Sequence, residues 1–436
     1  MQLISQLRAG VAKWPYALLS VMAALAAFGT YTCMYAFRKA FAAGTYSDQQ
    51  YFHIDYKVWL VIAQVLGYTL SKFYGIRFIA EVKPENRAKS ILVLIGISWL
   101  ALLGFALIPA PYNIAMLFIN GFPLGMIWGL VFGYLEGRRS TEFMASVMSI
   151  SLIFASGFVK TTGRTLMDGF HIHEYFMPFC TGALFVVPLL FCVFCMELIP
   201  APTQKDRQLR AERVPMPAAE RKAFFIRFLP GIMLTVIIYV MLTMMRDIRD
   251  NFEVEIWRGI GIQSNTIYTH IDTIISVIVL TAMSLLILIR KNLLAFGLIH
   301  IMIIAGCVLA GLSTVMFNLH LIGPVSWMTM AGLGLYLGYV PYNAIFFERM
   351  IASFSYKSNV GFVMYVADAM GYLGSISILL IKELVKPGIS WDEFFKHGLL
   401  VLSVVGGIGG MLSLFYFLQT ANRAQKDKRK LNLYTA

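Results

Sequence analysis

The chain has 436 residues, of which 58% are hydrophobic and only 14% are charged, and its mean hydropathy is +0.71. Ordinary soluble domains carry about a quarter charged residues, so this composition excludes that class and indicates a chain that lies in a bilayer. The net charge of +13 does not indicate nucleic-acid binding, because the Lys and Arg residues are distributed between apolar segments, where they set orientation in a membrane.

Apolar segments of membrane-spanning length follow one another along the chain. A spanning helix needs about 20 mostly apolar residues. Twelve segments meet this requirement, and the first is too long for a signal peptide. The predicted spans cover residues 16–43, 57–79, 89–109, 112–136, 143–166, 175–198, 224–250, 264–289, 293–315, 321–347, 358–384 and 394–420. The predicted fold is therefore an all-α integral membrane protein.

The distribution of loop charges predicts the topology. Lys and Arg residues gather in every second loop, as at Arg138 and Arg139, whereas the opposite loops are poor in both. Both termini are therefore expected in the cytoplasm, with the chain in a plasma membrane such as the bacterial inner membrane. A long polar interruption divides the spans six and six. The predicted domains are an N-terminal half (1–199), a cytoplasmic linker (200–223), a C-terminal half (224–422) and a basic cytoplasmic tail (423–436).

Charged residues inside the apolar segments recur in both halves at one offset. Arg38 and Arg246 are 208 residues apart, and so are Lys160 and Asp368. A charge near the middle of a membrane costs about 2.5 to 3.5 kcal/mol on insertion scales, so such side chains usually line a water-filled path or bind something. Two related six-helix halves match the major facilitator architecture, in which the halves rock around a site near the midplane. The pattern indicates a transporter.

Glycine and glutamate positions recur as well. Gly125 with Gly129 and Gly334 with Gly338 differ by an offset of 209. Glu136 and Glu348 close the fourth and tenth spans, and an arginine follows each within three residues. We interpret these glutamates as parts of inner-gate ion pairs, with an ordinary helix-end charge as the alternative.

The end of the first span carries polar residues on one helix face. Tyr31, Tyr35 and Arg38 are spaced i, i+4 and i+7, so they share a face, and Lys39 follows directly. We expect the two tyrosines to line the substrate path and Lys39 to act in coupling or gating. The alternative for Arg38 is an interfacial arginine whose charge reaches the outer surface.

The first and seventh spans resemble those of the organophosphate:phosphate antiporters of the major facilitator superfamily. The shared features are a tyrosine shortly before Arg38-Lys39-Ala-Phe41 and an arginine in a Tyr239-Val context, Arg246. The resemblance implies that Arg38 and Arg246 hold a phosphate group. A guanidinium presents a planar fork of donors that fits phosphate oxygens bidentately. The family's acidic residue after the second span is replaced by Ser71, which leaves open a relative with a different anionic substrate.

Further charged residues are candidates for the same path. Asp250 lies at i+4 from Arg246 and is a candidate partner for it, with a solvated helix end as the alternative. Lys160 and Arg164 lie in the fifth span, and Asp368 lies in the eleventh, so that Lys160 and Asp368 would either bind the two ends of a substrate or pair with each other. Asp272 in the eighth span is a further candidate for coupling.

The sequence gives no sign of a cofactor or a metal. The five cysteines lie in apolar stretches and are expected to pack in the core. His171, His173 and Glu174 form a short loop cluster that lacks a convincing further ligand. No nucleophile with a base and no phosphate-binding Gly-rich loop is found, which argues against an enzyme and against a primary pump.

The sequence therefore predicts a monomeric secondary active transporter of a small anionic metabolite, such as an organophosphate, a sugar phosphate or another acidic sugar. Two fixed arginines and a lysine would leave the empty site positive, so we expect exchange against a counter-anion by alternating access. The alternatives are a proton-coupled symporter, in which Asp368, Asp272 or Glu136 carries the proton, and a membrane sensor of the same fold that does not transport.

Overall fold

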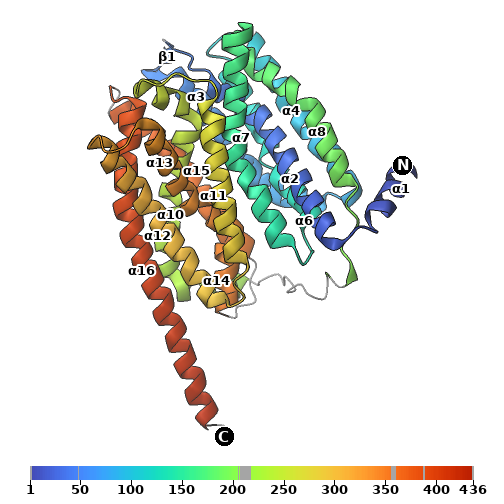
Figure 1. Ribbon diagram of the computed structural model, residues 1–436, viewed down its shortest axis with the longest axis vertical. Helices are drawn as coiled ribbons and strands as arrows, with labels where there is room; N and C mark the ends of the chain where they lie inside the picture. The colour runs from blue at the N-terminus through green and yellow to red at the C-terminus, as the bar shows by residue number, and fades with distance from the viewer. Residues whose placement is uncertain are drawn as a thin grey trace. The chain divides into compact units, whose positions relative to one another are not determined.

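The computed structural model describes residues 2–47, 49–204, 206, 218–354, 360–385 and 388–434 (Figure 1). The elements are α1 (Gln2–Val11), α2 (Tyr16–Arg38), η1 (Ala40–Ala43), β1 (Gln50–Tyr51), β2 (Ile54–Asp55), α3 (Tyr56–Glu81), η2 (Pro84–Asn86), α4 (Arg87–Leu107), α5 (Ile114–Leu124), α6 (Ile127–Leu135), α7 (Thr141–Phe170), α8 (Met177–Glu197), α10 (Ala218–Gly259), α11 (Ile267–Ile287), α12 (Asn292–Asn318), α13 (Pro324–Pro341), η3 (Tyr342–Phe346), α14 (Phe347–Ser353), α15 (Val360–Val385) and α16 (Trp391–Tyr434). The short strands β1 and β2 pair antiparallel, with Gln50 opposite Asp55.

Helices lie at all twelve predicted positions. Within the described part of the chain, nine helices are long and apolar enough to cross a membrane. The chain is therefore an all-α, multi-pass membrane protein, as the sequence predicted.

Two predicted spans are interrupted where proline removes a backbone donor. The span predicted over 112–136 consists of α5 and α6, and the break directly follows Pro123 near the end of α5. The span predicted over 321–347 consists of α13, the π-helical turn η3 and α14, with Pro341 at the first junction. Proline cannot donate the hydrogen bond that a helix interior requires.

Two other helices end at different residues than predicted. Helix α2 stops at Arg38, and the 3₁₀ turn η1 covers the last four residues of the predicted span. Helix α10 extends to Gly259, with a break at Phe252, whose φ of −117° and ψ of 20° are not helical. The extension carries several charged residues that a hydropathy pattern places outside the membrane.

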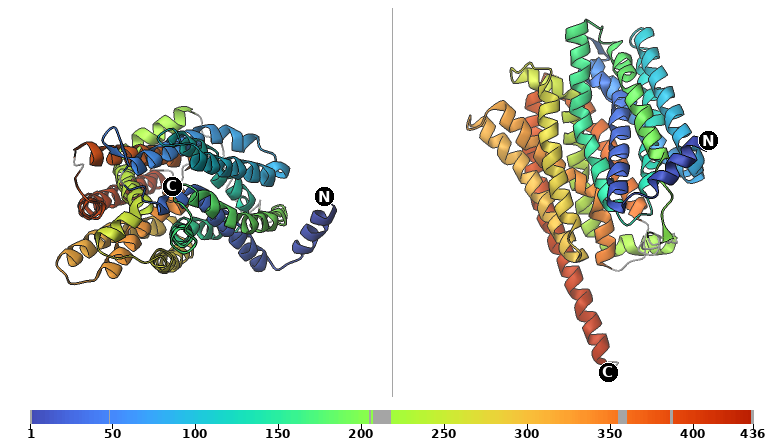
Figure 2. Two further views of the ribbon diagram at one scale, coloured as in Figure 1. Left: turned by 90° about the horizontal axis from the view of Figure 1, so that it is seen from above. Right: turned by 45° about the vertical axis from the view of Figure 1, so that its right-hand side comes forward.

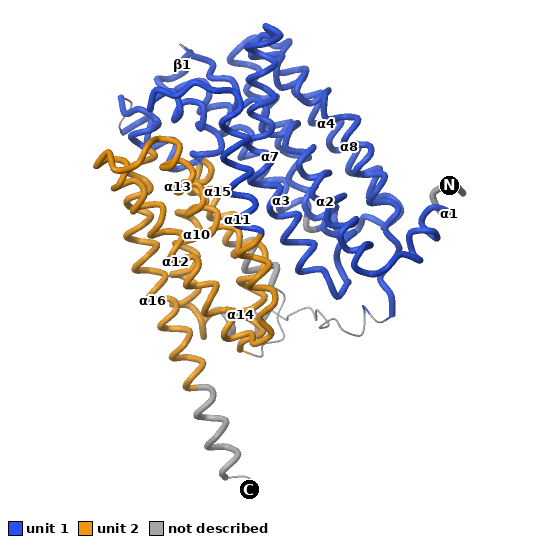
Figure 3. The backbone as a smooth tube through the Cα atoms, viewed as in Figure 1, with its two compact units in different colours: residues 1–210, 248–280, 376–394 blue, residues 211–247, 281–375, 395–436 orange. Residues whose placement is uncertain are grey.

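The chain forms two compact units (Figure 3). Unit 1 comprises residues 1–210, 248–280 and 376–394, and unit 2 comprises residues 211–247, 281–375 and 395–436. Unit 1 therefore contains helices α1 to α8, most of α11 and end segments of α10, α15 and α16. Of the predicted linker, residues 205 and 207–217 lie outside the described residues. The division into sequence halves remains a prediction.

Unit 1 is built around α2, which packs against α7 and α8, and around α3, which packs against α5 (Figures 1 and 2). Glycines allow the backbones of α3 and α5 to touch. A Cβ added at Gly67 would lie 2.3 Å from the carbonyl oxygen of Phe118, and one added at Gly121 would lie 2.3 Å from that of Gln64. Both positions therefore exclude a side chain, and the contact fixes Gln64 against α5.

In unit 2, glycines likewise allow the backbones of α12 and α13 to touch. A Cβ added at Gly334 would lie 2.5 Å from the carbonyl oxygen of Gly306, and the reverse distance is also 2.5 Å. In unit 1, a Cβ added at Gly125 would lie 1.8 Å from Ser71 Oγ and 2.7 Å from the carbonyl oxygen of Tyr68. The recurring glycines of the sequence thus serve close helix packing in both units.

Candidate functional site

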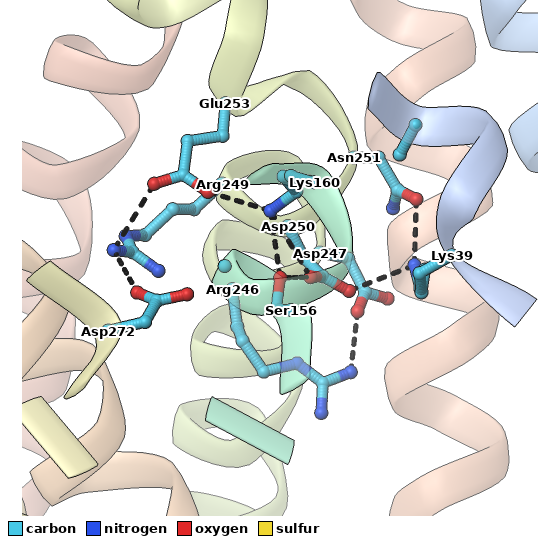
Figure 4. A network of polar contacts seen from close by, with 12 residues as sticks. Lys39, Ser156, Lys160, Arg246, Asp247, Arg249, Asp250, Asn251, Glu253 and Asp272 are labelled. Atoms are coloured by element: carbon cyan, nitrogen blue, oxygen red, sulfur yellow. Dashed lines mark hydrogen bonds and ion pairs between the residues drawn. The ribbon is translucent and has the colours of Figure 1, made fainter. Parts of the chain in front are cut away.

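Unit 1 contains a buried network of charged side chains (Figure 4). Its members come from the residue after α2, from α7, from the end segment of α10 and from α11. They are three cations, Lys39, Lys160 and Arg249, three carboxylates, Asp250, Glu253 and Asp272, and two neutral residues, Ser156 and Asn251.

Lys160 is at the centre of this network. Its Nζ lies 2.7 Å from Glu253 Oε2 and 3.6 Å from Asp250 Oδ1, and it donates a hydrogen bond of 2.7 Å to Ser156 Oγ. Ser156 in turn donates to Asp250. The Lys160 side chain is 0% exposed, and a buried ammonium group is stable only with such partners.

Arg249 and Lys39 extend the network on its two sides, and Asp272 and Lys39 are its end members. Arg249 Nη2 lies 2.7 Å from Asp272 Oδ1 and 3.5 Å from Glu253 Oε1. Lys39 Nζ lies 2.9 Å from Asp250 Oδ2. The carboxylates of Glu253 and Asp250 each bridge two cations, so the six charged groups form one continuous chain.

Among the ion pairs named here, three cations face three carboxylates. Asp250 and Glu253 are three residues apart on α10, and both contact Lys160. The expectation of an empty site made positive by two arginines and a lysine concerns Arg38 and Arg246, which are not members of this network, and it remains a prediction.

Lys160 pairs with Asp250 and Glu253, and Asp250 pairs with Lys39 and Lys160. Asp368 and Arg246 belong to unit 2. The relation of Lys160 with Asp368 and that of Asp250 with Arg246 therefore remain predictions.

Arg38 lies in a different part of unit 1, among aromatic rings. Its Cζ is 3.8 Å from the ring centroid of Tyr68 and 5.8 Å from that of Tyr35, distances typical of cation–π contacts. Arg38 is only 5% exposed, so it is not the surface-reaching arginine of the alternative interpretation. The Tyr31 ring packs beside Tyr35 and edge-on against Trp128, with centroids 5.8 and 4.9 Å apart.

The backbone around Arg38 is held by buried amide side chains. Gln64 Nε2 donates to the Arg38 carbonyl oxygen at 2.5 Å and to Asn120 Oδ1 at 2.8 Å. Asn120 Nδ2 donates to the carbonyl oxygens of Phe37 and Ser98 at 2.8 and 3.0 Å. Gln64, Asn120 and Ser98 come from α3, α5 and α4, so three helices meet at the end of α2.

Arg246 lies in unit 2, also over a tyrosine. Its Cζ is 4.1 Å from the ring centroid of Tyr339, and its Nη2 donates to Asp247 Oδ1 at 2.5 Å. Ser375 Oγ donates to the other oxygen of Asp247 at 2.7 Å. Arg246 is 8% exposed and Asp247 is 6% exposed, which argues against a solvated helix end.

Tyr239 connects this part of unit 2 to Asp368. The Tyr239 hydroxyl donates to Asp368 Oδ1 and lies 3.5 Å from Asn343 Oδ1, in the π-helical turn. Its ring stacks on that of Tyr339 with centroids 5.5 Å apart. Two predicted residues, Tyr239 and Asp368, are therefore in direct contact.

The remaining predicted residues lie outside these groups. Arg164 forms an ion pair of 3.0 Å with Asp168, whose side chain is 43% exposed. Glu136 directly follows the last residue of α6, and Glu348 lies in the first turn of α14. Both glutamates are half-buried, and their role in gating remains a prediction.

The loop histidines have structural contacts. The His173 ring stacks on that of Tyr175 at 5.5 Å, and Glu174 accepts a hydrogen bond from the Tyr46 amide at 3.0 Å. Within the ranges that the structure describes, no group of three His, Cys, Asp or Glu residues could hold a metal ion.

Several residues of these networks were not singled out from the sequence as site residues. Gln64 and Asn120 could have been found as isolated amides inside apolar spans. Arg249 directly precedes Asp250 at the predicted end of the seventh span, and Glu253 lies just beyond that end. Lys57, which pairs with Glu255 at 2.6 Å, stands at the start of the second span, where a lysine is unremarkable.

A family model described as "Family of unknown function (DUF5690)" matches residues 40–420. The chain belongs to this family. No curated protein matches the sequence.

Solved transporter structures share the fold. A D-xylose–proton symporter is 14% identical, with 92% of this chain and 97% of that chain covered and a TM-score of 0.58. A bacterial homologue of the human lysosomal transporter Spinster is 10% identical, with 92% and 98% covered and a TM-score of 0.60. A peptide transporter is 12% identical, with 96% and 99% covered and a TM-score of 0.61. The chain therefore has the major facilitator fold, as predicted.

Proposed function

We propose that this protein is a secondary transporter that moves a small anionic solute across the membrane by alternating access. The observation that carries the proposal is the pair of buried arginines at equivalent positions of the sequence repeat. Arg38 in unit 1 and Arg246 in unit 2 each lie over a tyrosine ring of their own unit. Both guanidinium groups are buried, and a buried charge is stable only with polar or oppositely charged partners, which an anionic solute supplies. At Arg246 the solute would share the guanidinium with Asp247.

The chemistry of the arginines favours phosphate or carboxylate groups. A guanidinium offers two parallel N–H donors to such a group, and a tyrosine face below its plane keeps the fork in one orientation. Organophosphates, sugar phosphates and other acidic sugars are the substrate classes that fit. The solved neighbours named as transporters support the same kind of activity for this fold.

The proposal can be tested with the full-length protein in liposomes. Uptake of labelled phosphate and sugar phosphates is measured for the wild type and for Arg38→Lys and Arg246→Lys. Lysine keeps the charge but loses the bidentate geometry. Because a hydrogen bond to a charged group contributes about 1.5 to 3 kcal/mol, we expect at least about a tenfold loss of uptake. Arg77→Lys is the matched control, because Arg77 is an exposed arginine whose ion pair, with Glu81, lies across one helix turn. Near-normal uptake by both test variants would refute the proposal.

For energy coupling, we propose exchange against a counter-anion, with proton coupling as a second candidate. The balanced charges of the unit 1 network favour the second candidate, because a neutral network does not need an anion to close and would gain net charge from one. Liposomes loaded with phosphate distinguish the two. Acceleration of uptake that survives a protonophore supports exchange, whereas accumulation driven only by a pH gradient, and lost in Asp272→Asn, supports proton coupling.

A further inference from the structure

At the carboxyl end of α2, the carbonyl oxygens of Phe37 and Arg38 lack the backbone donors that a longer helix would supply. In a continuing helix, the carbonyl oxygens of Phe37 and Arg38 would accept from the amides of Phe41 and Ala42. Here α2 ends at Arg38, and the Ala42 amide donates instead to Lys39 O at 3.0 Å. A buried carbonyl without a donor is costly in a membrane protein, so side chains have to supply the missing donors.

Gln64 and Asn120 supply them. Gln64 Nε2 bonds to Arg38 O, and Asn120 Nδ2 bonds to Phe37 O. The two amides also bond to each other, and Ser98 Oγ donates to the backbone carbonyl of Asn120 at 3.0 Å. Gln64 is 2% exposed, and Asn120 and Ser98 are 0% exposed. Water therefore does not replace these bonds readily.

The same face of α3 also contacts the Arg38 side chain. Gln64 and Tyr68 are four residues apart, so they lie one above the other on α3. Gln64 binds the backbone of Arg38, while the Tyr68 ring lies 3.8 Å from its guanidinium carbon. One face of α3 thus contacts both the backbone and the guanidinium of Arg38. The close contacts at Gly67 and Gly121 hold α3 against α5.

We infer that Gln64 and Asn120 are positioning residues for the anion-binding Arg38. They set the direction in which the guanidinium leaves the end of α2, although neither touches the anion. The inference rests on the proposed function for the role of Arg38, and it adds residues that determine how well that arginine binds. Without them α2 would end in another geometry, and the fork would no longer match the anion.

A double-mutant cycle separates positioning from mere support of the fold. Binding of inorganic phosphate to the purified full-length protein is measured for Gln64→Leu and Asn120→Leu, alone and combined with Arg38→Lys or Arg246→Lys. We expect about tenfold weaker binding from each single change, since one bond to a charged group is lost or misdirected. That loss should disappear in the Arg38→Lys background and persist in the Arg246→Lys background.

Asn113→Leu is the matched control. Asn113 is 0% exposed, and its Nδ2 donates to the Phe105 carbonyl oxygen at 3.2 Å near the end of α4. It is therefore also a buried amide that binds a backbone carbonyl near a helix end, but away from Arg38. We expect it to lower stability without changing phosphate binding. Equal losses from Asn113→Leu and Gln64→Leu, or losses from Gln64→Leu that are additive with Arg38→Lys, would overturn the inference.

Hydrogen exchange tests the positioning without any ligand. Gln64→Leu should speed amide exchange in residues 39–44 selectively, because the turn after α2 loses its anchor. If wild-type protein binds no phosphate but this local effect appears, the anion-binding function is wrong and the anchoring of α2 stands. If phosphate binds and residues 39–44 exchange as in the Asn113→Leu control, the positioning inference is wrong and the function stands.

Discussion

Arg38 and Arg246 occupy equivalent places in the sequence repeat, yet their surroundings differ. Arg38 is the last residue of α2, and neutral amide side chains from other helices complete its backbone hydrogen bonds. Arg246 lies inside α10, where the helix itself supplies the backbone bonds, and a carboxylate, Asp247, contacts its side chain. The two arginines therefore keep equivalent sequence positions, whereas the contacts that hold them differ.

The difference predicts which substitutions should displace each arginine. Changes in helices α3, α4 and α5 should reach Arg38 through its backbone. Changes near Arg246 should act through the charge of Asp247 and leave the backbone of α10 in place. The following variants test this contrast, from the largest expected effect to the smallest.

Lys160→Met should have the largest effect on stability. It removes the central cation of the unit 1 network and leaves Glu253 and Asp250 short of a positive partner. Breaking a buried ion pair costs about 3 to 5 kcal/mol. The free energy of unfolding in mixed lipid–detergent micelles is the measurement, and the double variant Lys160→Met/Glu253→Gln should recover part of the loss. No recovery would mean that the two groups are not coupled.

Gly121→Ala should destabilise the protein by about 1 to 3 kcal/mol, because the added methyl group meets a backbone carbonyl that cannot yield. Gly334→Ala in unit 2 should cost a similar amount. We expect Gly121→Ala to weaken phosphate binding more than Gly334→Ala does, since the added methyl group at residue 121 moves Gln64 away from Arg38. Gly96→Ala and Gly297→Ala are the controls, because no atom of the described residues lies within 4 Å of a Cβ added there. A larger binding defect in Gly334→Ala would contradict the contrast.

Ser375→Ala should lower the free energy of unfolding by about 1 kcal/mol, because Asp247 loses one donor but keeps Arg246. Gln64→Leu should cost more, since it leaves the Arg38 carbonyl without a donor. Urea or detergent titrations of both variants give the comparison. If Ser375→Ala lowers the free energy of unfolding more than Gln64→Leu does, the contacts of Asp247 matter more than the donor to Arg38, and the prediction is wrong.

Arg164→Gln should have the smallest effect. Its ion pair with Asp168 is an exposed i, i+4 pair on α7, and such pairs contribute about 0.3 to 0.5 kcal/mol. The free energy of unfolding of Arg164→Gln should be close to that of the wild type at both low and high salt. A loss comparable to that of Lys160→Met would indicate a role for Arg164 that its contacts do not suggest.

The sequence was sufficient for the fold, because the length of apolar segments and the turns between them place each helix. It also identified Arg38, Lys160, Asp250 and Asp272 as buried charges, since a charge inside an apolar span faces the interior of the helix bundle in most membrane proteins. The partners of these residues were not predictable in the same way. The carboxylates beside Lys160 depend on how α7 and α10 pack, and the repeat offset, which relates Lys160 to Asp368, carries no information on that packing.

Gln64 and Asn120 illustrate the limit more clearly. A single amide in an apolar span is compatible with a lining residue, a packing residue or a helix-end anchor. Only the early end of α2 reveals that carbonyls in this region need donors, and the last helical residue is among the features that a sequence pattern fixes least well.

The bonds of Asn120 also bear on how the chain enters the membrane. Its side chain meets α2, α3 and α4 at once, so an α5 that enters lipid before those helices have gathered would carry an unsatisfied amide. We therefore expect the first four spans to assemble during synthesis, before α7 and α8 emerge from the ribosome. Cysteine cross-linking between α3 and α5 in nascent chains stalled after α6 would reveal such early assembly, and Asn120→Leu would delay it.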